Sequence, residues 1–157
     1  MLVVIALGAN LGDRLASLRT AAARIAELGV VRARSTVYET EPVGGPPQPR
    51  YLNAALALET ALAPDALMER LLAIESSMGR VRAEKNGPRA IDLDVLWIEG
   101  VATKSESLEA PHPRLEERAF ALGPLVEVAP DARDPRTGRR YAVLAWDRRS
   151  LRAVEKL

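Results

Sequence analysis

The chain has 157 residues, of which 48% are hydrophobic and 27% are charged, proportions that suit a folded globular protein with a sizeable core. Its 22 basic and 21 acidic residues leave a formal net charge of +1, so nothing indicates a chain dominated by nucleic-acid or acidic-membrane binding. There are no cysteines and one histidine, which excludes disulfides, thiolate catalysis and zinc–thiolate sites and makes a histidine-based metal cluster improbable.

The chain begins with an apolar run at residues 2–7 that predicts a buried strand ending in a turn at Gly8. This segment lacks a basic leader region and is too short to span a bilayer, so we expect a cytoplasmic protein with no membrane contact. The next segment has apolar residues at helical spacing. It predicts a helix that starts at the N-cap residue Asp13 and is closed by Gly29.

Residues 30–38 predict a second strand and residues 52–58 a third. The stretch between them, 40–50 (TEPVGGPPQPR), is dense in proline and glycine and therefore predicts a loop. A second helix is predicted from Pro64, where the missing N–H of proline costs little, to Gly79.

An arginine-rich stretch, RVRAEKNGPR, leads into a strand that carries Asp92 and Asp94. Successive side chains of a strand point to opposite faces, so the two carboxylates share one face while Leu93 and its apolar neighbours enter the core. The tail after this strand predicts one short helix near 114–120 or a little beyond, then polar turns and a possible last helix.

The predicted order, strand–helix–strand–strand–helix–strand, is that of a ferredoxin-like α+β sandwich with a mostly antiparallel sheet. We expect the helices to cover one face of the sheet and leave the other face for a site, roofed by long loops. Because no repeat, low-complexity tract or linker divides the chain, we expect a single domain over residues 1–157.

The paired aspartates lie directly after three arginines, Arg80, Arg82 and Arg89. Mg²⁺ prefers oxygen ligands, often one or two carboxylates together with substrate phosphates and water, and arginines neutralise charge that moves between phosphate oxygens. This combination favours metal-assisted phosphoryl transfer. Each charge taken alone is explained as well by a solvated surface. The sequence has no P-loop motif, and GANLGD at 8–13 lacks the full dinucleotide fingerprint.

Tyr51 and Asn53 alternate with Leu52 at the start of the third predicted strand, so both could face the same side. A tyrosine face can stack on a heteroaromatic ring, an asparagine amide can pair with its edge, and Phe120 could cover the opposite face. His112 lies between two prolines. Taken singly, each of these residues is more often structural than functional.

Six blocks of the chain together resemble 6-hydroxymethyl-7,8-dihydropterin pyrophosphokinase, a family of the folate pathway. The blocks are LGANLGDR at 7–14, YETEP at 38–42, YLNAAL at 51–56, GRVR at 79–82, GPRAIDLDVL at 87–96 and PHPRLEERAF at 111–120. They occur in the family's order and spacing, and the resemblance runs from the first strand to about Leu125.

The resemblance implies transfer of the pyrophosphoryl group of ATP to the hydroxymethyl group of the dihydropterin, with release of AMP. It implies ATP and the pterin as partners, two Mg²⁺ ions as cofactors, and a monomer. The implied metal ligands are Asp92 and Asp94; the implied catalytic arginines are Arg80, Arg82 and Arg89, which also contact ATP together with Glu75, His112 and Arg118. The implied pterin pocket comprises Thr40, Pro42, Val43, Tyr51, Asn53, Asp92 and Phe120. The loops around 44–49 and 82–87 match the two that close over the substrates.

Two positions depart from the pattern of some members. Asn86 stands where a tryptophan occurs in the catalytic loop, and Pro113 stands where a tyrosine follows the histidine. We expect both differences to affect ATP affinity or loop closure, without removing a metal ligand or a phosphate-binding arginine. The residues identify no general base.

Two other functions compete with this one. A simple kinase or nucleotidyltransferase on the same fold would share the aspartate pair but would not need the Tyr–Asn–Phe pocket. An RNA-binding module of the same topology would need two or three aromatic side chains on its central strands and a basic face. The aromatic content of 4% and the net charge of +1 support that second alternative poorly.

Overall fold

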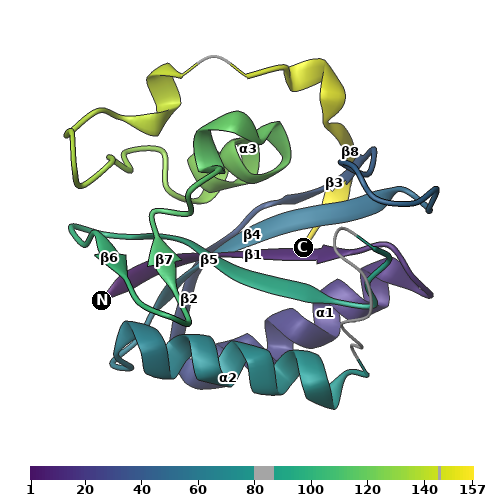
Figure 1. The fold of residues 1–157 in the computed structure, drawn as a ribbon, viewed down its shortest axis with the longest axis horizontal. Helices are drawn as coiled ribbons and strands as arrows, with labels where there is room; N and C mark the ends of the chain where they lie inside the picture. Colours follow the sequence, from purple (N-terminus) through teal and green to yellow (C-terminus); the bar gives the residue numbers. More distant parts are fainter. Residues whose placement is uncertain (80–86, 145) are drawn as a thin grey trace.

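The computed structural model describes residues 1–79, 87–144 and 146–157, and one antiparallel sheet forms its centre (Figure 1). The strands of this sheet are β1 (Leu2–Ala9), β2 (Val30–Arg34), β3 (Thr36–Thr40), β4 (Tyr51–Glu59), β5 (Asp92–Ile98) and β8 (Arg152–Lys156). Their order is β5-β1-β4-β3-β8, with β2 also paired to β4. In terms of the predicted strands, the order across the sheet is fourth, first, third, second. This confirms the ferredoxin-like sandwich.

Two helices, α1 (Arg14–Ile25) and α2 (Pro64–Ser77), cover one face of the sheet (Figure 1). Asp13 caps α1 as predicted, because its side chain accepts a hydrogen bond from the Ala16 backbone N–H at 3.1 Å. The core under these helices is built from alternate residues of the strands, among them Ile5 and Leu93. The helical spacing in the sequence therefore predicted this layer correctly.

A third helix, α3 (Ala119–Val128), packs on the opposite face of the sheet (Figure 1), so the expectation of a face without helices was wrong. A second core lies there, in which Val4 and Trp97 contact Leu122 and its neighbours. Strands that are buried on both faces are apolar at every position and not only at alternate ones. The continuous apolar run of β1 therefore indicated that this strand is buried on both faces.

The second predicted strand is divided at Ser35 into β2 and β3. Ser35 Oγ accepts from the Ala55 backbone N–H at 2.8 Å and donates to the Thr36 carbonyl at 2.7 Å, so a side chain replaces one step of the strand ladder. The irregular stretch that follows β3 covers residues 41–50, which agrees with the predicted loop.

The C-terminal prediction was partly wrong. The short helix expected near 114–120 or a little beyond is a 3₁₀ turn followed by the longer helix α3, which continues through an internal Pro124. The expected last helix is the edge strand β8, which pairs antiparallel with β3. Among the described residues, no helix combines the length and hydropathy needed to cross a membrane.

Short elements complete the description. They are the 3₁₀ turns η1 (Ala26–Leu28), η2 (Leu115–Glu117), η3 (Tyr141–Val143) and η4 (Arg148–Ser150), and the small hairpin of β6 (Thr103–Lys104) and β7 (Glu109–Ala110). Gly29 follows η1 and not α1 itself. A Cβ atom there would lie 2.1 Å from the Glu59 carbonyl oxygen, so only glycine allows this close approach of the chain to β4.

Candidate active site

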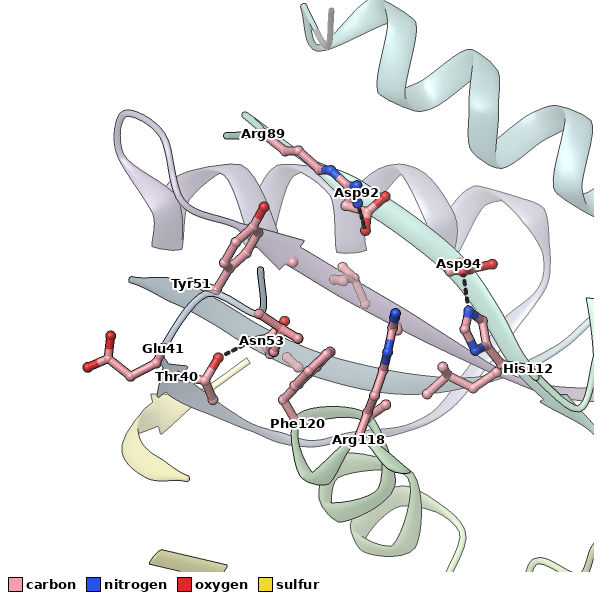
Figure 2. A pocket seen from close by; sticks show the side chains of 17 residues that line it. Thr40, Glu41, Tyr51, Asn53, Arg89, Asp92, Asp94, His112, Arg118 and Phe120 are labelled. Atoms are coloured by element: carbon pink, nitrogen blue, oxygen red, sulfur yellow. Dashed lines mark hydrogen bonds and ion pairs between the residues drawn. The ribbon is translucent and has the colours of Figure 1, made fainter. Parts of the chain in front are cut away.

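A pocket opens on the α3 side of the sheet, over β1, β4 and β5 (Figure 2). Its empty volume is about 840 Å³, which includes space open to solvent. The predicted site residues that line it are Thr40, Val43, Tyr51, Asn53, Arg89, Asp92, Asp94, His112, Arg118 and Phe120. Residues up to 80 positions apart in the sequence thus meet in one cavity.

The acidic end of the pocket is formed by Asp92 and Asp94 on β5, whose side chains are 34% and 41% exposed. Leu93, between them, is buried in the core on the other face, as the alternation predicted. Arg89 Nη1 donates to Asp92 Oδ2 at 2.7 Å, and His112 Nε2 lies 3.2 Å from Asp94 Oδ2. Each carboxylate therefore has a basic side chain beside it.

Two backbone contacts fix the orientation of His112. The His112 N–H donates to the Leu96 carbonyl of β5 at 2.9 Å, and the Arg114 N–H donates to His112 Nδ1 at 3.1 Å. Because Nδ1 accepts a hydrogen bond, Nε2 carries the ring proton and presents it to Asp94.

The donor chemistry of the aspartate pair fits Mg²⁺. Two partly exposed carboxylates supply hard oxygen ligands, and Mg²⁺ is often held by one or two carboxylates together with phosphate oxygens and water. In the part of the chain that the structure describes, no group of three or more His, Cys, Asp or Glu side chains is arranged to hold a metal ion. The fit accordingly rests on Asp92 and Asp94 alone.

The opposite end of the pocket is a slot lined by Tyr51, Asn53, Thr40 and Phe120 (Figure 2). Asn53 Nδ2 donates to Thr40 Oγ1 at 2.6 Å, and both residues are buried. The hydroxyl of Tyr51 donates to the Gly87 carbonyl at 3.1 Å, which fixes the plane of the ring. Two aromatic rings and a held amide are thus ready for a flat, hydrogen-bonding ligand.

Arg118 extends between the two ends of the pocket (Figure 2). Its Cζ lies 5.6 Å from the centre of the Phe120 ring, and its buried Nε has no hydrogen-bond partner among the described residues. Burial, together with the neighbouring Arg114, lowers the pKa of Arg118, while Asp94 and Asp92 oppose that shift. Since a guanidinium remains charged in proteins, this arrangement favours an anionic ligand beside it.

Four predicted site residues are not placed in the pocket. Arg80 and Arg82 lie outside the described residues. Pro42 belongs to the loop that borders the pocket but does not line it. Glu75 is 2% exposed on α2, where it accepts a hydrogen bond from the Leu93 backbone N–H at 2.7 Å. Glu75 thus supports the aspartate-bearing strand from behind.

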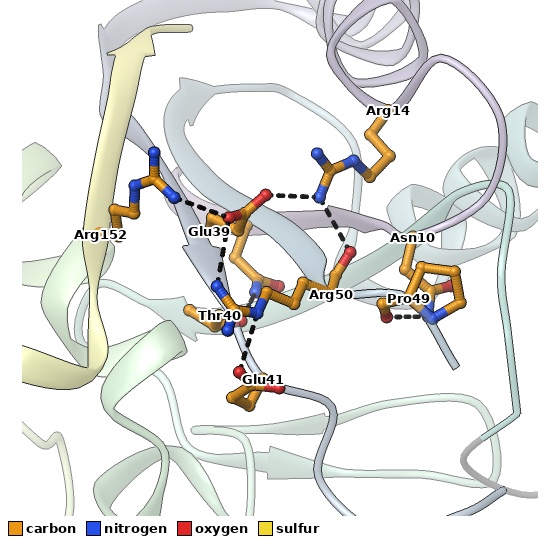
Figure 3. A network of polar contacts seen from close by, with 9 residues as sticks. Asn10, Arg14, Glu39, Thr40, Glu41, Pro49, Arg50 and Arg152 are labelled. Atoms are coloured by element: carbon orange, nitrogen blue, oxygen red, sulfur yellow. Dashed lines mark hydrogen bonds and ion pairs between the residues drawn. The ribbon is translucent and has the colours of Figure 1, made fainter. Parts of the chain in front are cut away.

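The sequence interpretation missed the floor and one edge of the pocket. Gly8 and Ala54 lie on the floor. A Cβ atom at Gly8 would come within 3.0 Å of Asn53 Oδ1, so glycine leaves room for that amide; its small size was the only signal. Glu41 lines the edge, and its carboxylate points away from the pocket centre toward Arg50 (Figures 2 and 3).

An antiparallel α+β sandwich whose pocket joins paired carboxylates and arginines to an aromatic slot defines an enzyme of the phosphoryl-transfer class. The sequence matches the family described as 7,8-dihydro-6-hydroxymethylpterin-pyrophosphokinase over residues 4–130. The chain belongs to this family, and its activity is that of a pyrophosphokinase of folate synthesis.

Curated relatives support the assignment. A 2-amino-4-hydroxy-6-hydroxymethyldihydropteridine pyrophosphokinase of Methylorubrum extorquens is 47% identical over 127 residues, which cover 80% of each chain. The Bacillus subtilis protein of the same name is 38% identical over 151 residues, 93% of this chain and 90% of that one.

Solved structures of a Plasmodium falciparum HPPK-DHPS protein share the fold. One, determined with pteroate, has a TM-score of 0.67 at 14% identity and aligns with 91% of this chain. The chain spans only 42% of the length of that protein, and at this identity the similarity shows the fold alone.

Proposed function

We propose that the pocket binds ATP and 6-hydroxymethyl-7,8-dihydropterin side by side, and that the enzyme transfers the β,γ-pyrophosphoryl group to the pterin hydroxymethyl in a Mg²⁺-dependent reaction that releases AMP. The observation that carries this proposal is the continuity of one pocket from the Asn53–Thr40 slot to Asp92 and Asp94. A reaction between a flat ring and a triphosphate requires such an arrangement, because both reacting groups must be held close together.

The slot would take the pterin. Tyr51 and Phe120 would stack on its two faces, and Asn53 would pair with its ring edge while Thr40 holds the amide in place. Pro42 and Val43 belong to the loop that borders this slot, and Asp92 would contact the pterin from the other end of the pocket. Stacking and edge pairing together select a flat heterocycle over a nonaromatic alcohol.

The other end would take the triphosphate. Arg89 and Arg118 supply guanidinium donors for phosphate oxygens, and His112 supplies a proton at Nε2. Asp92 and Asp94 would hold two Mg²⁺ ions. When bound, these ions would neutralise charge on the phosphate oxygens during transfer. Arg80 and Arg82 complete the proposed phosphate contacts, on family resemblance alone.

The deciding experiment is product analysis. Purified protein is incubated with ATP, Mg²⁺ and the dihydropterin, and the products are separated by chromatography. We expect AMP and a pterin diphosphate to form in equal amounts, and only when the pterin is present. The reaction should stop when EDTA removes divalent ions. ADP in place of AMP would show single phosphoryl transfer and refute the proposed bond cleavage; full activity in EDTA would refute the metal requirement.

We further propose, on the family resemblance, that the enzyme acts as a monomer. Activity per mole that is independent of protein concentration, with a sedimentation mass near the 17.0 kDa of one chain, is the expected result. A dimer at the assay concentration would contradict it.

A further inference from the structure

Arg114 is a basic residue beside the pocket that the proposed reaction does not use. Its backbone N–H donates to His112 Nδ1 at 3.1 Å, so it lies next to the side chain that faces Asp94. Its guanidinium is turned to the carboxylate of Glu117, with 3.3 Å between Arg114 Nε and Glu117 Oε2. The two side chains are 53% and 70% exposed, and neither lines the pocket. Arg114 is thus a cation held at the edge of the pocket by a partner outside it.

The charge of Arg114 acts on the phosphate end of the pocket. Burial lowers the pKa of Arg118, the positive charge of Arg114 is the next largest cause, and Arg89 acts in the same direction. Guanidinium groups repel each other at short range, and the two aspartates of β5 offset this repulsion only in part. The buried Nε of Arg118 also has no hydrogen-bond partner among the described residues. An anion bound beside Arg114, Arg118 and His112 would remove the repulsion.

The ion pair that holds Arg114 is one that a ligand can open. An exposed ion pair contributes little to stability, whereas hydrogen bonds from a guanidinium to a phosphate are among the strong ones in proteins. Arg114 comes directly before the 3₁₀ turn η2, and Glu117 is the last residue of that turn. Side chains at this spacing eclipse each other in a 3₁₀ helix. Rotation about the bonds of the long Arg114 side chain therefore exchanges Glu117 for a ligand without movement of the backbone.

We propose that Arg114 is a further ATP-binding residue of this enzyme: when ATP enters, the guanidinium leaves Glu117 and binds an oxygen of the phosphate chain beside His112. Glu117 is then a competing anion that holds Arg114 away from the nucleotide in the empty enzyme. The proposal rests on the proposed function for the identity of the nucleotide. It differs from a purely structural ion pair in one respect, because removal of Arg114 and removal of Glu117 have opposite effects on ATP binding.

Two single variants and their combination test these opposite effects. Arg114→Ala retains the backbone N–H to His112 but loses the guanidinium. We expect the KM for ATP to rise about tenfold, with kcat and the pterin KM changed by less than about twofold. Glu117→Ala frees Arg114, and we expect the KM for ATP to fall about threefold. The double variant should have the KM of Arg114→Ala, because Glu117 acts only through Arg114. A shift of the ATP KM in the same direction in both single variants would overturn the proposal.

Arg149→Ala is the matched control, because Arg149 makes the same kind of contact in another 3₁₀ turn. Its Nε lies 3.3 Å from Asp147 Oδ1 at η4, and its removal takes the same charge from the chain. Its side chain is 94% exposed and does not line the pocket. We expect kcat and both KM values of this variant to be those of the unaltered enzyme. An equal rise in the ATP KM of Arg149→Ala and Arg114→Ala would show an effect of net charge alone and overturn the proposal.

Calorimetric titration with a non-hydrolysable ATP analogue and Mg²⁺, in the absence of pterin, measures the same affinities independently of turnover. We expect Arg114→Ala to bind the analogue about tenfold more weakly than the unaltered enzyme. The difference should persist when the salt concentration rises from about 0.05 M to about 0.5 M, because a direct contact is screened less than a field at a distance. Equal affinities, or a difference that vanishes at high salt, would overturn the proposal. An unaltered enzyme that binds the analogue but forms no AMP from ATP and the pterin would instead refute the proposed function.

Discussion

At the scale of single residues, Asp92 and Asp94 are placed for function rather than for stability. Their side chains are 34% and 41% exposed. They share one face of the strand, and no lysine lies between them. Two like charges at this spacing repel each other unless cations lie nearby. Arg89 and His112 supply that compensation in part.

We therefore predict that Asp92→Ala and Asp94→Ala each lower kcat by at least about a hundredfold, the size typical for loss of a charge-stabilising group at a reacting centre. The thermal midpoint should change by no more than a few degrees, because little buried contact is lost. Steady-state kinetics and thermal melts test this. Asp131→Ala is the control, since its carboxylate is 93% exposed in an ion pair with Arg140; retained turnover in both pocket variants would contradict the assignment.

The Thr40–Asn53 hydrogen bond makes a prediction about the pterin slot. In Thr40→Val the Asn53 amide loses its acceptor at 2.6 Å and is free to rotate. We expect the pterin KM to rise about tenfold with the ATP KM unchanged, since one buried hydrogen bond contributes about 1 kcal/mol. Initial-rate kinetics with each substrate varied in turn measure it. A change confined to the ATP KM would place the pterin elsewhere.

At the scale of elements, the division of β2 from β3 depends on one side chain. Ser35 is fully buried, and its Oγ satisfies the Ala55 backbone N–H. Ser35→Ala leaves that N–H without a partner in the middle of the sheet. We predict a loss of about 1–3 kcal/mol in the free energy of unfolding, with kcat of the folded enzyme unchanged.

Urea denaturation followed by circular dichroism measures this loss. Ser150→Ala is a suitable control, because Ser150 also uses its hydroxyl on a backbone group but lies in an exposed turn. Equal stabilities of the two variants would show that Ser35 does not support the junction.

The elements that the sequence predicted well are those with local signals. The helix at Asp13 has a cap and a periodic apolar face, and β5 alternates carboxylates with core residues. The elements it missed lack such signals. Pro124 argues against the helix that contains it, and β8 is exposed at every residue, so its pairing with β3 depends on contacts from across the molecule.

The candidate site follows the same rule. Residues with distinctive chemistry, such as His112 and Asp94, were found from the sequence because motif spacing identifies them. Gly8 acts through its close approach to Asn53, a neighbour 45 positions away in the sequence. Glu75 was assigned from the family resemblance alone. It is buried on α2 and accepts a hydrogen bond from the Leu93 backbone N–H, and its contact with ATP stays a prediction.

At the scale of the whole molecule, buried or half-buried glutamates tie distant segments together. Glu39 on β3 accepts from Arg14 and Arg152 and lies 3.7 Å from Arg50 (Figure 3). The hydrogen bond from Arg14 is the main cause of its lowered pKa. Glu39 thus links α1, the loop before Tyr51, and the C-terminal strand.

Glu127 performs the same task for α3. It accepts hydrogen bonds from the Thr36 N–H, the Thr36 hydroxyl and the Tyr38 hydroxyl at 2.7–2.8 Å. Burial acts to raise the pKa of Glu127, but the hydrogen bonds from Tyr38 and Thr36 outweigh it, and the pKa is lowered. A lowered pKa in the folded state means that the unfolded chain binds protons more readily in acid.

The sign of the pH dependence follows from this difference. The stabilising contribution of Glu127 is fully present above the ordinary glutamate pKa of about 4.3 and is lost as the pH falls through the lower, folded-state value. We therefore predict that Glu127→Gln is less stable than the unaltered protein by about 1–2 kcal/mol at pH 7. The gap should narrow as the pH falls through the lowered folded-state pKa of Glu127, because the carboxylate then becomes protonated.

Urea unfolding at pH 7, 5 and 3 measures both proteins in parallel. Glu106→Gln is the control for loss of a glutamate from an exposed turn, and its gap from the unaltered protein should stay small at every pH. A Glu127→Gln gap of the same size at pH 7 and pH 3 would show that the contact between α3 and β3 rests on packing, not on the charge of Glu127. The whole molecule would then owe its acid sensitivity to other carboxylates, of which Glu39 is the first to test.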